Sequence, residues 1–199
     1  MASKRRKQIL ETALTLFNEQ GAANVTTNHI AAAMGISPGN LYYHFRSKEE
    51  IIAAIVEQMV TSWDPMYQVD LGASFTLETL SAMQRLHFEL LWEYRFFYRE
   101  VPTLLRRDPQ LKARYFEIRD QRIVQQIGLV KTIAQTGAIR LPPDKELHQL
   151  FTITWILADT WLAFQELEED WDESKLEIYI ERGVSHVLSL YKPYFFESQ

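Results

Sequence analysis

The 199-residue sequence contains no cysteine, which excludes disulfide bonds and metal sites built from thiolates. Glycine and proline are scarce, with seven residues of each, and most of them fall where a helix is expected to end. The basic N-terminal segment MASKRRKQIL lacks the apolar stretch of a secretory signal peptide. These absences predict a soluble, cytoplasmic protein whose helices have few interruptions.

An apolar run long enough to cross a membrane is also missing. The candidate, LFTITWILADTWLAF at residues 150–164, is shorter than the ~20 residues that a bilayer requires. It contains Asp159, and an acidic side chain costs ~2.5–3.5 kcal/mol at the centre of a membrane. The run is therefore expected to form a buried helix, and no membrane partner is predicted.

Two kinds of catalytic site find little support. The five histidines do not stand at metal-binding spacings, and Asp144 and His148, four residues apart, are more typical of a surface ion pair. The segment GISPG at residues 35–39 matches the G-x-S-x-G motif of serine hydrolases, but that motif requires a preceding strand. Here an alanine-rich helical segment precedes it. We expect no enzymatic activity, no catalytic residue, no metal and no cofactor.

The main pattern in the sequence is helical, because apolar residues repeat every three to four positions along most of the chain. Ser47 and Glu50 have the spacing of a capping box and mark the start of one long helix. No segment shows the convincing alternation of a strand. We therefore predict an all-α fold, with helices at about residues 9–20, 27–34, 37–46, 47–63, 77–98, 109–135, 143–168 and 173–191.

Two of the short helices are joined by a turn that contains Gly35, which is the layout of a helix-turn-helix motif. Leu41 and Phe45 form the buried side of the second helix, and Ile30 and Ile36 can pack under them. In such a motif the second helix lies in the major groove of DNA. The surface left for DNA carries polar and aromatic side chains, namely Asn40, Tyr42, Tyr43 and His44.

Charge is distributed unevenly along the chain. Residues 1–48 hold six Lys or Arg and two acids, a net charge of +4, so the remainder carries −9 to give the total of −5. A basic N-terminal segment followed by an acidic remainder suggests that the N-terminal segment binds nucleic acid. An ordinary solvated N-terminal helix would give the same pattern.

This part of the sequence resembles the N-terminal domain of the TetR/AcrR family of transcriptional regulators. The resemblance covers about residues 4–60. It rests on ILETALTLFNEQG, on the Thr-x-x-x-Ile-Ala pattern from Thr26 to Ala31, on Gly35-Ile36-Ser37, and on LYYHF followed by SKE. The all-helical remainder is compatible with the family, and YRFFYREVPTLLRRDPQL resembles one subgroup of it.

The resemblance implies a role for each matching residue. Hydroxyl groups and Lys48 would hold phosphates, which set the orientation of the protein on DNA. Residues at the start of the second helix would face the groove, where Asn40 can bond adenine at two positions. Asn28 is short and Pro38-Gly39 offers few hydrogen bonds, so DNA shape is expected to share the readout. The expected DNA contacts are Thr26, Thr27, Asn28, Ser37, Pro38, Gly39, Asn40, Tyr42, Tyr43, His44 and Lys48.

Aromatic residues are concentrated in FELLWEYRFFY, residues 88–98, and they cover more than one face of the expected helix. Most should pack the core, and some should line a cavity. Asp159 would be a buried carboxylate that needs a partner, either an internal arginine or a polar group of a ligand. Pairs of residues four apart on neighbouring helices give the candidate ligand site: Trp92, Phe96, Tyr115, Arg119, Trp155 and Asp159.

The last two expected helices have apolar faces that suit a dimer interface. Residues 147–167 are apolar nearly all round. Two such helices from each protomer would form a four-helix bundle, or else the same faces are buried within one chain. The stripe along the final helix consists of Leu176, Ile180, Gly183, Val184, Val187, Leu188 and Tyr191.

We therefore predict a homodimeric, TetR-like repressor with an N-terminal helix-turn-helix DNA-binding domain at residues 1–47. A larger helical domain, residues 48–199, would serve dimerisation and effector binding. The DNA partner would be an inverted-repeat operator, and a small apolar or acyl-type effector would release it. The alternative is an all-helical ligand-binding or hydrolytic protein whose N-terminal helices are only structural.

Overall fold

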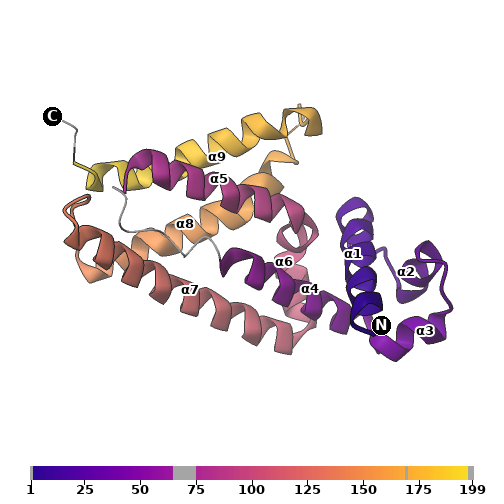
Figure 1. Cartoon of the computed structure of the whole chain (residues 1–199). Coiled ribbons are helices and arrows are strands. Elements are labelled where there is room, and N and C mark those ends of the chain that lie inside the picture. Colours follow the sequence, from indigo (N-terminus) through magenta and orange to yellow (C-terminus); the bar gives the residue numbers. More distant parts are fainter. Residues whose placement is uncertain (1, 65–74, 169, 197–199) are drawn as a thin grey trace. The chain divides into compact units, whose positions relative to one another are not determined.

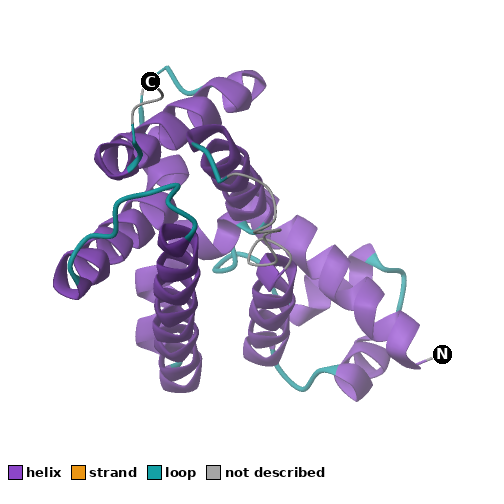
Figure 2. Ribbon diagram, turned by 60° about the vertical axis from the view of Figure 1, so that its left-hand side comes forward, coloured by secondary structure: helices purple, strands orange, loops and turns teal. Residues whose placement is uncertain are grey.

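The computed structural model describes residues 2–64, 75–168 and 170–196, and helices connected by loops account for most of them (Figure 1). In this part of the chain no strand forms, as the ribbon diagram shows (Figure 2), and an isolated bridge joins Ile139 to Phe195. The predicted all-α fold is confirmed. The α-helices are α1 (Ala2–Gln20), α2 (Thr27–Ala33), α3 (Pro38–His44), α4 (Lys48–Trp63), α5 (Leu77–Glu93), α6 (Arg95–Arg107), α7 (Pro109–Gln135), α8 (Asp144–Gln165) and α9 (Leu176–Tyr191), with 3-10 helices η2 (Glu173–Lys175) and η3 (Lys192–Tyr194).

Two compact units make up the chain. Unit 1 consists of residues 1–62 and 94–114, and unit 2 consists of residues 63–93 and 115–199. The chain thus passes from one unit to the other three times. Unit 1 extends beyond the first three helices because α6 packs against α1. The functional boundary expected between residues 47 and 48 stays a prediction.

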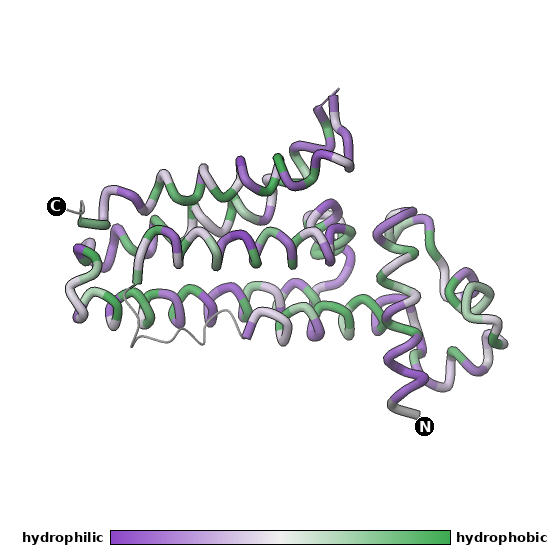
Figure 3. Tube along the Cα trace, turned by 45° about the horizontal axis from the view of Figure 1, so that its top comes forward, coloured by the Kyte–Doolittle hydropathy of each residue, from purple (hydrophilic) through white to green (hydrophobic). Residues whose placement is uncertain are grey.

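The first three helices of unit 1 pack against one another around a small apolar core. Ile30, Leu41 and Phe45 are almost completely buried, as the sequence predicts, whereas Ile36 is only partly buried. Hydrophobic and hydrophilic residues are interspersed along the helices (Figure 3), and apolar residues spaced by three or four positions fall on one face of a helix. Burying a side chain of this size stabilises a fold by ~1.5–3 kcal/mol. This core therefore holds α3 firmly in place.

The start of α6 is held by side chains and backbone of α1. Asn18 Oδ1 accepts a hydrogen bond from the backbone N–H of Phe96 at 3.0 Å, and Arg99 donates to the Asn18 carbonyl at 2.7 Å. The backbone leaves the helical conformation at Tyr94, with φ −105° and ψ 28°. The single helix expected at residues 77–98 is therefore wrong, because it is divided into α5 and α6. Pro102 also lies inside α6 instead of beyond its end.

Unit 2 is organised around α9, which packs against α5 and α8. Gly183 is enclosed at the middle of α9, where an added Cβ would lie 2.6 Å from Trp161 and 2.8 Å from Phe88. Ile180 and Val184 on the same face are buried as well. Much of the α9 stripe is thus buried within its own unit, which was the second of the two alternatives, whereas Leu176 and Leu188 are only partly buried.

A different apolar face lies open on α8. Ile153, Ile156, Phe164 and Leu167 have exposed fractions of 51–80%. Their spacing of three, eight and three residues suits one side of a helix, and Leu167 lies in the turn directly after the last residue of α8, Gln165. We call these four residues the open face of α8.

None of the helices in the described residues has the length and hydropathy that a membrane span requires. The same residues contain no group of three or more His, Asp or Glu side chains arranged to hold a metal ion. Asp144 pairs with Lys131 at 2.8 Å, so the ion pair suggested for it with His148 is replaced by a contact between α7 and α8.

Candidate functional site

Two side-chain caps define the helix-turn-helix segment. At the start of α2, Thr26 Oγ1 accepts from the backbone N–H of His29 at 3.3 Å, and the Thr26 N–H donates to His29 Nδ1 at 3.4 Å. At the start of α3, Ser37 Oγ accepts from the Asn40 N–H at 3.2 Å. Gly35 in the turn adopts φ +62°, a conformation that favours glycine. Each cap contributes ~0.5–2 kcal/mol, so even the short α3 has a defined start.

The capped α3 helix presents an exposed polar and aromatic face. Tyr42 and Tyr43 are 59% and 82% exposed, and the ring of Tyr43 meets that of His44 edge-on at 5.2 Å between centroids. Ser37 through Asn40 are also exposed. None of the eleven residues expected to contact DNA is buried; Thr27, His44 and Lys48 are partly exposed and the other eight are exposed. Their contact with DNA stays a prediction.

The start of α4 is anchored to the rest of unit 1. Lys48 Nζ donates to the carbonyl of Ala22 at 2.6 Å, and because an ammonium has three donors, two are left for a phosphate. Ser47 Oγ accepts from the Glu50 N–H at 3.2 Å, which is the first bond of the expected capping box. The Glu50 carboxylate accepts from the N–H of Arg46 at 2.8 Å, one residue before the position of the usual second bond.

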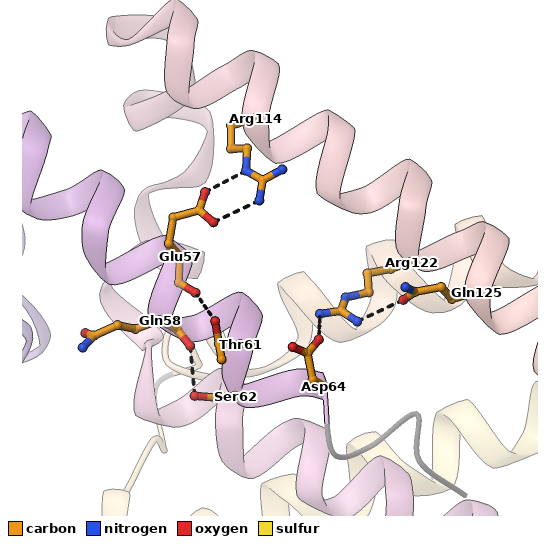
Figure 4. Close-up of polar contacts among 8 residues, drawn as sticks. All are labelled: Glu57, Gln58, Thr61, Ser62, Asp64, Arg114, Arg122 and Gln125. Atoms are coloured by element: carbon orange, nitrogen blue, oxygen red, sulfur yellow. Dashed lines mark hydrogen bonds and ion pairs between the residues drawn. The ribbon is translucent and has the colours of Figure 1, made fainter.

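Two arginines of α7 bind acidic residues at α4 and just after it (Figure 4). In unit 1, Arg114 donates to both carboxylate oxygens of Glu57, at 2.7 and 2.9 Å, and these bonds hold the pKa of Glu57 below its usual value. In unit 2, Arg122 donates to Asp64 at 2.5 Å and to Gln125 at 2.9 Å, and its side chain is only 7% exposed. The Arg114–Glu57 pair holds α4 to α7 in unit 1, and the Arg122–Asp64 pair holds the residue that follows α4 to α7 in unit 2.

A buried hydrogen-bond chain lies along α8. Tyr115 Oη donates to Asp159 Oδ2 at 2.6 Å and accepts from Trp155 Nε1 at 3.0 Å. Burial raises the pKa of Asp159 to about 7, and burial beside this carboxyl also raises the pKa of Tyr115. The sequence left an arginine or a ligand as the partner of Asp159, and the structure shows a tyrosine.

Unit 2 also encloses a cavity with a volume of about 90 Å³. Its walls are mostly aliphatic and aromatic, which is typical of a site for a small apolar molecule. Among the described residues that line it there is no Lys, Arg, Asp or Glu. The walls come from α5 (Leu80, Met83, Gln84, His87), α7 (Gln126, Leu129, Val130, Ile133), α8 (Leu147, Leu150, Phe151, Thr154, Trp155) and their surroundings (Phe75, Ile139, Pro142, Tyr191, Tyr194, Phe195).

The six residues expected to bind a ligand do not line one site. Trp155 lines the cavity, and it bonds to Tyr115, which bonds to Asp159. Arg119 lies elsewhere, because it pairs with Asp120 at 2.7 Å and covers the ring of a neighbouring phenylalanine. The cavity therefore contains one member of the expected set.

Trp92 and Phe96 were expected on one helical face because they are four residues apart. The break at Tyr94 separates them. Trp92 packs against Trp171 at 5.8 Å between ring centroids, and Phe96 is buried in unit 1 against Phe17. The spacing argument failed because it assumed one continuous helix.

The polar residues of the cavity wall were missed from the sequence. Gln84 and His87 share a helical face with Leu80 and Leu91, as their spacing of four, three and four residues shows. A polar residue on an otherwise apolar face was the available signal. It is weak alone, because the sequence does not show which other elements complete the wall.

Two protein families match the sequence of this chain. The sequence model of the family described as "Bacterial transcriptional repressor" matches residues 57–199, more than half of the chain. That of "Bacterial regulatory proteins, tetR family" matches residues 9–55, which include the helix-turn-helix segment.

Individual relatives agree with these matches. A TetR-family regulator from Marinobacter aquaeolei VT8, known from its crystal structure, is 34% identical, with a TM-score of 0.83 over 96% of this chain and 91% of that one. The repressor KstR2 of Mycolicibacterium smegmatis is 32% identical over 90 residues, 45% of this chain, and the match spans less than half, 44%, of that protein. A regulator from Saccharomonospora viridis, solved with choline, shares the fold at 21% identity, with a TM-score of 0.74 over 98% and 100% of the two chains. The chain belongs to the TetR family of bacterial transcriptional regulators.

Proposed function

We propose that the protein is a repressor that binds an inverted-repeat operator as a homodimer and is released from it by a small apolar effector. The observation that carries this proposal is the capped α3 helix, whose exposed residues from Ser37 to His44 combine base-reading and phosphate-binding side chains.

The division of labour on α3 follows from chemistry. Asn40, at the first turn, can bond adenine at two positions in the major groove, which discriminates against other bases by ~1–3 kcal/mol. The hydroxyls of Tyr42 and Tyr43 suit phosphates, and such contacts orient a protein without reading sequence. Lys48 keeps two donors for the backbone after bonding Ala22.

A second copy of the reading helix is required. α3 has seven residues, a length of about 10 Å, so it spans only a few base pairs. Two copies related by two-fold symmetry would read half-sites about one helical turn of DNA apart, or a multiple of it. The open face of α8 is the surface proposed for this dimer, because exposed apolar residues at helical spacing suit a helix bundle between protomers.

The cavity of unit 2 supports control by an effector. α7 lines the cavity and also carries Arg122, which binds Asp64 directly after α4. α4 leads back along the chain to the helix-turn-helix. An occupant that favours one arrangement of α7 would therefore act on α4, and it can do so only through different affinities for the two arrangements.

The hydrolase alternative loses its basis at GISPG. The segment that precedes it is helix α2 instead of a strand, and Ser37 caps α3. A nucleophile elbow needs a strand before the serine.

The test is DNA binding by the full chain. Gel shifts with DNA flanking the coding region, followed by selection from random sequence, should give an inverted repeat. Asn40→Ala should change the selected sequence, whereas Tyr42→Phe should weaken binding to all sequences alike. Thr15→Ala, an exposed change on α1, is the control that should do neither. If the selection gives no preferred site, the proposed function is contradicted. If Asn40→Ala selects the same site as the parent, the role of Asn40 in reading the sequence is contradicted.

A further inference from the structure

The cavity of unit 2 is suited to an uncharged occupant. Among its described lining residues, His87 is the one whose side chain can become a cation, and burial lowers its pKa to about 4. Tyr191 and Tyr194 contribute phenol hydroxyl groups to the wall. A charged ligand would lose its hydration here without meeting an opposite charge, and such burial is strongly unfavourable.

One acceptor in this wall has no partner. Gln84 Oε1 is buried and receives no hydrogen bond from any described residue. A buried carbonyl without a donor costs free energy, which a suitable donor recovers. Because Gln84 lines the cavity, a change of its side-chain torsions would let a ligand O–H or N–H donate to this oxygen.

Two further polar side chains of the wall, Thr154 and Trp155, already have hydrogen-bond partners. Thr154 Oγ1 donates to the carbonyl of Leu150 at 2.9 Å and lies 3.0 Å from Tyr191 Oη. Trp155 Nε1 donates to Tyr115. Gln84 differs from both, because its buried oxygen has no donor among the described residues.

We propose that this cavity binds an uncharged, slender apolar molecule with one hydroxyl group, and that Gln84 accepts a hydrogen bond from that hydroxyl. A volume of about 90 Å³ suits a short chain, since each water-sized group needs ~10–15 Å³. The inference rests on the proposed function in that this molecule would be the effector. It also narrows the effector class, because carboxylates and other acyl anions are disfavoured.

Cations are the main competing class. Aromatic rings bind quaternary ammonium groups through their faces, and several rings line this cavity. The described residues of the wall nevertheless include no carboxylate, and the unpaired Gln84 oxygen accepts a hydrogen bond, which a quaternary ammonium cannot donate.

Calorimetry on the full chain without DNA tests the class with four probes of one chain length. We expect 1-octanol to bind at least about tenfold more tightly than octanoate or octyltrimethylammonium. We also expect it to bind about three- to tenfold more tightly than octyl methyl ether, which cannot donate a hydrogen bond. Equal or tighter binding of either ion would overturn the proposal that the ligand is uncharged, and equal binding of the ether would overturn the role of the hydroxyl.

Variants test the position of the ligand. Gln84→Met should weaken 1-octanol to the affinity of the ether and leave the ether unchanged. Val130→Phe, which fills the cavity, should abolish binding of both. Val124→Phe makes the same change at a position of α7 that is 65% exposed and outside the cavity, so it should bind like the parent. Unchanged binding in Val130→Phe would place the ligand elsewhere.

These measurements are separate from the proposed function. If 1-octanol binds as expected but leaves the operator complex intact in a gel shift, the site stands and control by an effector of this class is rejected. If no operator exists, the calorimetric result still decides the inference.

Discussion

His87 and Asp159 both belong to unit 2, and burial shifts their pKa values in opposite directions. Burial disfavours the imidazolium and lowers the pKa of His87 from 6.5 to about 4, and it disfavours the carboxylate and raises the pKa of Asp159 from 3.8 to about 7. Between about pH 4 and 6.5, the unfolded chain binds more protons at His87 and the folded chain binds more at Asp159. His87 thus makes stability rise with pH in this window, and Asp159 makes it fall.

Substitution of either residue should reveal the effect of the other on the pH dependence of the free energy of unfolding. His87→Gln should make the free energy of unfolding fall as pH rises from about 4 to about 7, by no more than about 1.4 kcal/mol per pH unit. Asp159→Asn should make it rise from about pH 4 to 6.5 by a similar amount. Urea unfolding at half-unit pH steps, for the parent, both single variants and the double variant, measures this difference. Single variants with the pH profile of the parent would show that neither pKa is shifted.

The helix-turn-helix geometry around the residues expected to contact DNA was predictable because its signals are local. The caps, the turn glycine and the buried positions Leu41 and Phe45 all lie within about 25 residues of sequence. The residues of the cavity were not, because its wall joins segments from Phe75 to Phe195. Lys48 was predictable in part. Its place at the start of a helix was expected from the sequence, but its hydrogen bond to the Ala22 carbonyl was not.

Among the elements, the helices were predictable from periodicity and most of their ends from glycine and proline. The break between α5 and α6 was not. Asn18, 78 residues away from Phe96, supplies the acceptor that a new helix start requires, and no local pattern reveals such a partner. Pro102 lies inside α6, where an internal proline costs a helix ~3 kcal/mol. The contacts of α6 with α1 offset this cost, and they too involve residues far away in the sequence.

Gly183 and Gly128 provide a matched test of helix packing. Both lie inside helices, but a Cβ at Gly183 would collide with the Trp161 ring, which is held by a 2.8 Å bond from Nε1 to the Tyr179 carbonyl. A Cβ at Gly128 meets nothing within 4 Å. Gly183→Ala should therefore destabilise the chain by ~1–3 kcal/mol. Gly128→Ala should stabilise it by ~0.5–1 kcal/mol, because glycine is the poorer helix former.

Thermal and urea unfolding of both glycine variants checks this pair. The opposite signs matter more than either value, because a general effect of adding a methyl group would act alike in both. A neutral Gly183→Ala variant would mean that α5, α8 and α9 pack less closely than the structure shows.

At the scale of the whole molecule, the proposed dimer decides whether α3 can work. Stable interfaces bury about 800 Å² per partner, and the open face of α8 offers exposed apolar side chains between Ile153 and Leu167 for its centre, with the exposed Thr160 among them. Substitutions at Gly183 or Val184 would not test the dimer, because both residues belong to the core of unit 2. The test must use residues that are exposed in the single chain.

Ile156→Asp, alone and together with Phe164→Asp, should convert a dimer into a folded monomer. Charged side chains in an apolar interface would be desolvated without partners, whereas the exposed positions tolerate them in the monomer. Sedimentation should then give the mass of one chain, circular dichroism should be unchanged, and binding to the inverted repeat should be lost, because one α3 helix reads only one half-site. Val124→Asp, which adds the same charge to an exposed position of α7, should leave both the dimer and DNA binding intact. A dimer that persists in the double variant would place the interface elsewhere, and a monomer that still binds the operator tightly would show that two copies are not required.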